Sequence, residues 1–63
     1  MNYYSVTYQR RKNHAGPFRK HATEFVIAAS LEQATASAER VCDALAADYT
    51  RDDFRPAIVE EID

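Results

Sequence analysis

The residues of this chain that could do chemistry are one cysteine and two histidines: Cys42, His14 and His21. A thiol and two imidazoles are side chains that bind zinc or act as nucleophile and base. The histidines lie seven residues apart in a segment that contains Gly16 and Pro17, and no recognisable spacing relates either of them to Cys42. We therefore predict no metal site, no catalytic residue and no cofactor, and we do not expect this chain to be an enzyme.

The composition is that of one small folded domain spanning residues 1–63. Hydrophobic residues make up 46% and charged residues 29%, an ordinary globular balance. We find neither a signal peptide nor an apolar run of the roughly 18–20 residues that a membrane span needs, so we expect a cytoplasmic protein. A core of this size rarely supplies more than about 3–5 kcal/mol, and a protein partner or self-association is therefore to be expected.

Two strands are predicted in the first half of the chain. Residues 3–10 alternate so that Tyr4, Val6 and Tyr8 share one face, and tyrosine and valine favour strands. A second strand is predicted over residues 22–29. The segment between them, residues 11–21, contains a Gly-Pro pair and predicts a long connection between antiparallel strands.

A helix is predicted from Leu31 to about Tyr49. Ser30, with Gln33 three residues later, matches the capping box that begins many helices. Cys42 falls on the apolar side of this helix, where a free cysteine is usually a small core residue. At 100° per residue the predicted buried face consists of Leu31, Ala34, Ala38, Val41, Cys42, Leu45 and Tyr49.

The last predicted strand covers residues 54–62, and Pro56 indicates a strand at the edge of the sheet. The resulting fold is α+β with the order β-β-α-β, a three-stranded antiparallel sheet in the order 2-1-3 and one helix packed on one face. The alternative places the third strand parallel to the second and beside it. Both arrangements leave one sheet face bare, and we expect it to carry Tyr3, Ser5, Thr7, Val26 and Ala28, with Ala57 and Val59 as further candidates.

The charge is unevenly distributed along the chain. The first 21 residues carry five basic side chains and no acidic one, whereas the remainder carries three basic and ten acidic side chains. The segment from Arg10 to His21, here called the basic hairpin, could contact phosphates, and nearby aromatic rings could stack on bases. On the helix, Glu32, Glu39 and Asp43 form an acidic row that Asp48, Asp52 and Asp53 are predicted to extend.

The join between the second strand and the helix carries a resemblance to a known group of proteins. The segment Glu24-Phe25-Val26-Ile27-Ala28-Ala29-Ser30-Leu31-Glu32-Gln33-Ala34 resembles joins in tiny phage-encoded proteins. Small anti-CRISPR inhibitors are similar in size, in element order and in having no catalytic motif. The resemblance implies a stoichiometric inhibitor that binds a large nucleic-acid-handling complex, and it implies no particular site residues.

Three functional hypotheses follow from these observations. The first is a non-enzymatic protein-binding module, which electrostatic complementarity would steer to its partner. The second is direct nucleic-acid binding through the basic hairpin, and the third is a structural homodimer formed through the bare sheet face. The predicted partner-binding residues are Tyr3, Arg10, Arg11, Lys12, Phe18, Arg19 and Lys20, with Glu32, Glu39 and Asp43 as a second patch.

Overall fold

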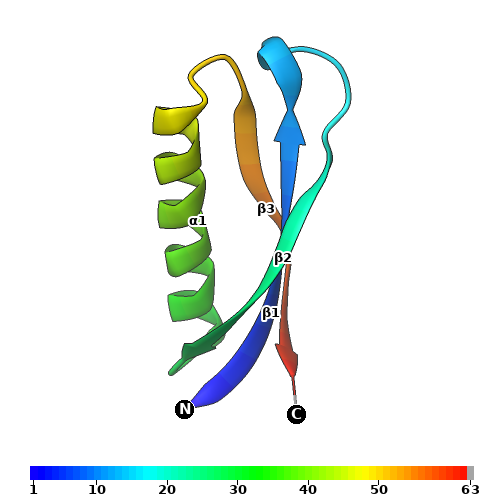
Figure 1. Ribbon diagram of the computed structural model, residues 1–63. Coiled ribbons are helices and arrows are strands. Elements are labelled where there is room, and N and C mark those ends of the chain that lie inside the picture. The colour runs from blue at the N-terminus through cyan, green and yellow to red at the C-terminus, as the bar shows by residue number, and fades with distance from the viewer. Residues whose placement is uncertain (63) are drawn as a thin grey trace.

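The computed structural model describes residues 1–62 as three strands and one long helix (Figure 1). The strands pair in the order β2-β1-β3, and both pairings are antiparallel. This confirms the predicted β-β-α-β fold and excludes the alternative in which the third strand lies beside the second. The elements are β1 (Asn2–Arg11), a 3-10 turn (Lys12–His14), β2 (Arg19–Ala28), α1 (Leu31–Asp48) and β3 (Asp53–Ile62).

The central strand β1 supplies most of the core. Its alternating side chains Tyr4, Val6 and Tyr8 are buried against the helix, as the sequence pattern predicts. Tyr8 is held further by its hydroxyl, which donates to Glu24 Oε1 at 2.6 Å. β1 is paired on both of its edges, with β2 and with β3.

Helix α1 begins where the capping box predicts. Ser30 Oγ accepts from the Gln33 backbone N–H at 3.2 Å, and Gln33 Oε1 accepts from the Ala29 N–H at 3.1 Å. The residues of α1 that are fully buried are small ones, Ala34, Ala38 and Cys42. Their short side chains leave room between the helix and the sheet for the two large tyrosines of β1.

Two residues assigned to the buried helix face lie nearer the surface. Leu31 is 53% exposed and Tyr49 is 48% exposed. Leu31 is the first residue of α1. Tyr49 follows the last helical residue, and its N–H donates to the Leu45 carbonyl at 2.8 Å.

The strands are longer than predicted and the loop between them is shorter. β1 continues through Arg11 and β2 already begins at Arg19, so the connection covers only residues 12–18. Register shifts interrupt both pairings of β1, one opposite β2 next to His21 and one opposite β3 next to Ala57. Pro56 lies in β3, which is an edge strand as predicted.

Candidate binding surfaces

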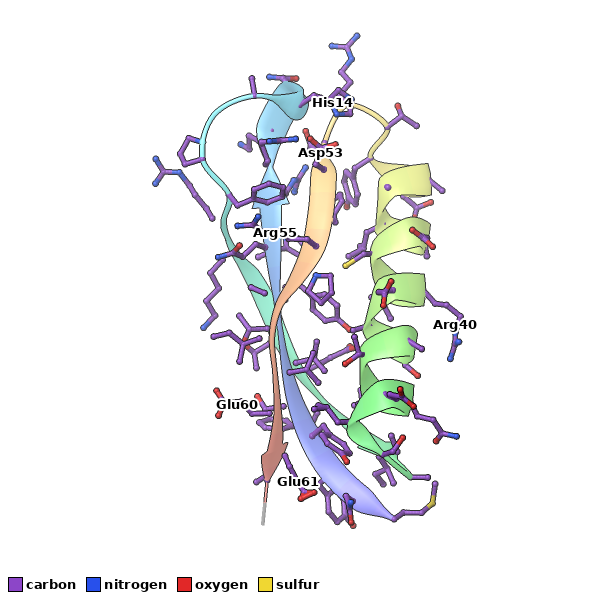
Figure 2. The ribbon with its side chains drawn as sticks, turned by 180° about the vertical axis from the view of Figure 1, so that it is seen from behind. His14, Arg40, Asp53, Arg55, Glu60 and Glu61 are labelled. Atoms are coloured by element: carbon purple, nitrogen blue, oxygen red, sulfur yellow. The ribbon has the colours of Figure 1, made fainter. Side chains whose placement is uncertain are left out.

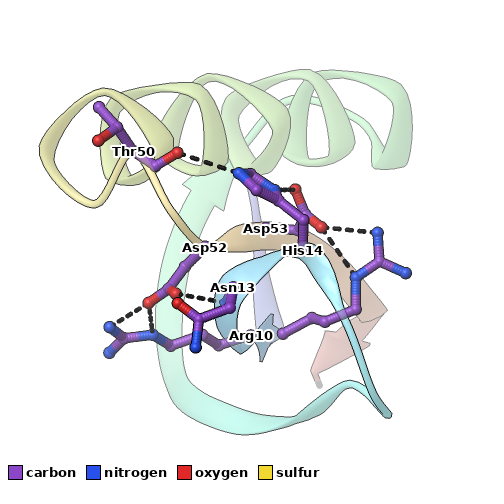
Figure 3. A network of polar contacts seen from close by, with 7 residues as sticks. Arg10, Asn13, His14, Thr50, Asp52 and Asp53 are labelled. Carbon is purple, nitrogen blue, oxygen red and sulfur yellow. Dashed lines mark hydrogen bonds and ion pairs between the residues drawn. The ribbon is translucent and has the colours of Figure 1, made fainter.

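The basic hairpin contacts the connection between α1 and β3, and both lie at the same end of the molecule (Figure 1). Arg10 Nε donates to Asp52 Oδ2 at 2.6 Å, and a second guanidinium nitrogen of Arg10 pairs with the same oxygen. The other oxygen, Oδ1, accepts from the Asn13 backbone N–H at 3.1 Å (Figure 3). These contacts lower the pKa of Asp52, first through the Asn13 N–H and then through Arg10. Asp52 is thus a buried carboxylate with two fixed donors.

Asp53 makes a second, parallel set of contacts. Its Oδ2 accepts from Arg11 Nε at 2.8 Å, and its Oδ1 lies 2.7 Å from His14 Nδ1. The other ring nitrogen of His14, Nε2, lies 3.2 Å from the Thr50 carbonyl oxygen (Figure 3). Both neighbours are acceptors, so the imidazolium, which donates from both ring nitrogens, is the form of His14 that makes both hydrogen bonds. The hydrogen bond to Asp53 accordingly raises the pKa of His14, and the His14 and Arg11 hydrogen bonds lower the pKa of Asp53.

These contacts change the predicted charge distribution. Asp52 and Asp53 were expected to extend the acidic row of the helix, and this prediction is wrong because both carboxylates face the basic hairpin. Arg10 and Arg11 are partly neutralised as a result. The cations of the hairpin that form no ion pair with another side chain of residues 1–62 are Lys12, Arg19 and Lys20.

Aromatic rings support the arginines at this end of the molecule. The Arg10 guanidinium lies 4.7 Å from the centre of the Tyr49 ring. Phe18 is contacted by two guanidinium groups, that of Arg55 at 3.9 Å and that of Arg11 at 4.7 Å. Phe18 therefore serves as a stacking partner for arginines within the protein, and its ring is only partly exposed.

A concavity of about 410 Å³ opens beside the hairpin. Its walls carry several positive charges and no carboxylate. It is lined by Arg10, Lys12, Ala15, Pro17, Arg19, Lys20 and His21. The ring of His21 is itself packed edge-on against Phe54, with the centroids 5.4 Å apart.

The sheet face that α1 does not cover, here called the open face, differs from the predicted one. Val26, Ala28 and Val59 pack in the core beneath the helix, which contradicts their expected exposure. Ala57 lies at the register shift and forms no regular pair with β1. Tyr3, Ser5 and Thr7 do lie on the open face, and the register places Phe25, Ile27, Ile58 and Ile62 beside them.

The open face is apolar at one end and polar at the other. Phe25 is 73% exposed, and Tyr3, Ile27, Ile58 and Ile62 are also exposed. Toward the hairpin, Arg55 donates to Gln9 Oε1 at 2.9 Å, and Lys20 pairs with the same glutamine in the register. Glu60 lies on the side of β3 away from α1, among the apolar residues (Figure 2).

The predicted site residues are not brought together at one place. Arg10, Arg11, Lys12, Phe18, Arg19 and Lys20 gather at the hairpin end, whereas Tyr3 lies at the opposite end of the sheet. The acidic residues Glu32, Glu39 and Asp43 are exposed on α1, and Arg40 of the same helix points away from the sheet (Figure 2). Within residues 1–62 these three carboxylates form no ion pair with the basic hairpin.

The remaining chemically capable residue lies in the core. Cys42 is buried as predicted, and burial, followed by the charges of Asp43 and Glu39, raises the pKa of its thiol. Within residues 1–62, no three His, Cys, Asp or Glu side chains are grouped so that they could hold a metal ion. In the same part of the chain, no helix has the length and apolarity that crossing a membrane requires.

The exposed residues that sequence reasoning missed are Phe25, Ile27, Arg55, Ile58 and Ile62. Alternation in β2 separates Phe25 and Ile27 from Glu24, Val26 and Ala28, but it does not decide which of the two sets faces the helix. No protein family matches the chain, and comparisons with curated proteins and with solved structures find no similar chain. The surfaces above therefore have to be interpreted from their own geometry and charge.

Proposed function

We propose that this chain is a non-enzymatic protein-binding module that docks a protein partner on its open face. The observation that carries the proposal is the exposure of five large apolar side chains on one side of a three-stranded sheet. Contiguous apolar surface of this kind marks interaction sites in soluble proteins. The residues are Tyr3, Phe25, Ile27, Ile58 and Ile62.

The charges on the open face define the chemistry of the partner. At its other end, toward the hairpin, the open face carries two cations. They are Arg55 and Lys20, which both pair with Gln9 in the strand register. The complementary surface of the partner is therefore apolar, with carboxylates at one end. The charged end fixes the orientation of the complex and speeds its formation. The aromatic and aliphatic side chains supply most of the affinity.

A second copy of this chain fits the open face poorly. Sheets that stack face to face keep their strands roughly aligned. With the strands of two copies parallel, the apolar ends superpose but Arg55 of one copy opposes Lys20 of the other. With the strands antiparallel and centred on Ser5, Glu60 opposes Glu60. Because both arrangements set like charges against each other, the proposal commits to a different protein as the occupant.

Stoichiometric inhibition of a nucleic-acid-handling complex is one biological form that such binding could take. The resemblance in element order to small phage-encoded inhibitors implies it, and it stays a prediction. The proposed docking itself does not depend on which complex the partner belongs to.

Site-specific photo-crosslinking in native lysate tests the docking surface. A photoreactive phenylalanine analogue replaces Phe25 in one variant and Ile58 in another, and it replaces Ala36 on the exposed side of α1 as a matched control. We expect one discrete adduct from positions 25 and 58 that survives nuclease. Excess wild-type chain should compete with it, whereas excess Phe25→Asp chain should not.

Two results would overturn the proposal. Equal adducts from position 36 would show that capture does not depend on the open face. An adduct with the mass of two copies of this chain would assign the face to a homodimer instead. Circular dichroism of the Phe25→Asp variant should match that of the wild type, since Phe25 is largely exposed and contributes little to the core.

A further inference from the structure

We propose that the concavity beside the basic hairpin is a binding site for a phosphate group carried by a nucleotide or by a polynucleotide. The site shares Lys20 with the polar end of the open face, but it contains none of the five apolar residues that carry the proposed function. Arg10 and Arg19 pair in the register on the side of the sheet that faces α1, beyond the last turn of the helix. Variants of those five apolar residues should therefore leave phosphate binding unchanged.

The first argument is charge. Four cationic side chains line the concavity, and none of its lining residues is acidic. Three of them, Lys12, Arg19 and Lys20, form no ion pair within residues 1–62. Like charges held close together repel one another, and a phosphate with its multiple oxygen acceptors offsets that repulsion.

The second argument is that the site is held in place before any ligand arrives. The loop backbone adopts positive φ at Asn13 (54°), His14 (55°) and Gly16 (81°). Asparagine and histidine tolerate this conformation better than most residues. Asp52 binds the Asn13 N–H and the Arg10 guanidinium, so one wall of the concavity is fixed by the connection between α1 and β3.

The third argument is the shape and character of the walls. A volume of about 410 Å³ lies within the usual range for small-molecule sites, roughly 300–1,000 Å³. Pro17 and the His21 ring provide apolar surface next to the cations, and the ring is backed by Phe54. Such surface suits the sugar or base that accompanies a nucleotide phosphate, as stacking does in single-strand binding proteins.

The test compares three probes on the wild type and two matched double variants. The probes are inorganic phosphate and thymidine monophosphate, followed by amide chemical shifts, and a fluorescent oligodeoxythymidine, followed by anisotropy. Arg19→Gln with Lys20→Gln removes two cations of the concavity. Arg40→Gln with Arg51→Gln removes the same charge from exposed positions that do not line it.

We expect amide shifts confined to residues 10–21 and their neighbours on β3. At about 50 mM salt, the Arg19–Lys20 variant should bind roughly tenfold more weakly, and the Arg40–Arg51 variant should bind like the wild type. For the oligonucleotide, log Kobs should fall with log salt at a slope near −2. Each phosphate neutralised on a single strand contributes about −0.7, and the three cations that form no ion pair within residues 1–62 would neutralise about three phosphates.

The outcomes separate the sources of the phosphate. Binding of thymidine monophosphate as well as oligonucleotide assigns the site to nucleotides in general, and binding of oligonucleotide alone assigns it to the polynucleotide backbone. Both support the inference. No binding of any probe at low salt, or equal losses in the two double variants, overturns it, and neither result bears on the five apolar residues of the open face.

Discussion

His14 and Asp53 lie 2.7 Å apart, Nδ1 to Oδ1, although 39 residues separate them in the sequence. The contact joins the loop after β1 to the start of β3. Together with the contact between Arg10 and Asp52, it links the basic hairpin to the segment before and at the start of β3. Because one partner is a histidine, the stability of this link depends on pH.

The free energy of unfolding should decrease as the pH rises through the pKa of His14. Because this pKa is raised in the folded state, the stabilising contribution is complete below the unfolded value of about 6.5 and disappears above the folded value. Urea unfolding between about pH 6 and pH 9 measures this contribution as the difference in the free energy of unfolding between the wild type and His14→Gln. A His14 NMR titration with an unshifted pKa, or one that Asp53→Asn leaves unchanged, would contradict the prediction.

Tyr8 should resist ionisation until the protein unfolds in alkali. Burial, followed by the hydrogen bond to Glu24, raises its pKa well above the ordinary value. In the unfolded chain the phenol ionises near pH 10, so the free energy of unfolding should decrease above that pH. Absorbance near 295 nm should show one of the four tyrosines titrating only together with unfolding.

Tyr8→Phe provides the control for the alkaline titration. At neutral pH this variant should lose about 1 kcal/mol, since it gives up the hydrogen bond to Glu24. It should also lack the unfolding-linked part of the titration. If the wild type and Tyr8→Phe lose stability equally above pH 10, the phenol is not responsible.

Ala38→Leu should destabilise the protein by about 1–3 kcal/mol, because the larger side chain does not fit between α1 and the sheet. Ala38 is 1% exposed and contacts the core around Val6 and Tyr8. Ala44→Leu, on the exposed side of the same helix, should change stability by less than about 0.5 kcal/mol. Thermal unfolding measures both, and equal shifts in Tm would contradict close packing at Ala38.

Phe18 and Arg55 should be energetically coupled. Their stacking at 3.9 Å predicts a coupling free energy of about 0.5–1 kcal/mol in a double-mutant cycle of Phe18→Leu and Arg55→Gln. The same cycle with Arg51→Gln in place of Arg55→Gln should give a value near zero. A coupling that is no larger for Arg55 than for Arg51 would show that the stacked geometry contributes nothing in solution.

The parts of the fold that local patterns determine could be predicted from the sequence. Alternation in β1 predicted the buried face of Tyr4, Val6 and Tyr8, and the capping box predicted the helix start at Leu31. These features depend on residues within a few positions of one another. A right-handed connection through the helix favoured the order β2-β1-β3, but the sequence left open a third strand beside the second.

The candidate surfaces depend on pairing between distant segments, which no local pattern reveals. The contacts of Asp52 and Asp53 require the register between β1 and β3. The exposure of Phe25 depends on the register between β1 and β2, which pairs it with Ser5 on the open face, whereas Ala28 lies beneath α1.

The pairing of the first strand with the last affects how the chain folds. β1 and β2 can associate as soon as the hairpin exists, but β1 and β3 meet only after nearly the whole sequence is available. Contacts between residues so far apart in sequence slow folding, because the chain loses loop entropy before the contacts form. During synthesis, one edge of β1 therefore stays unpaired until β3 has emerged, and the nascent chain is prone to aggregation in that interval.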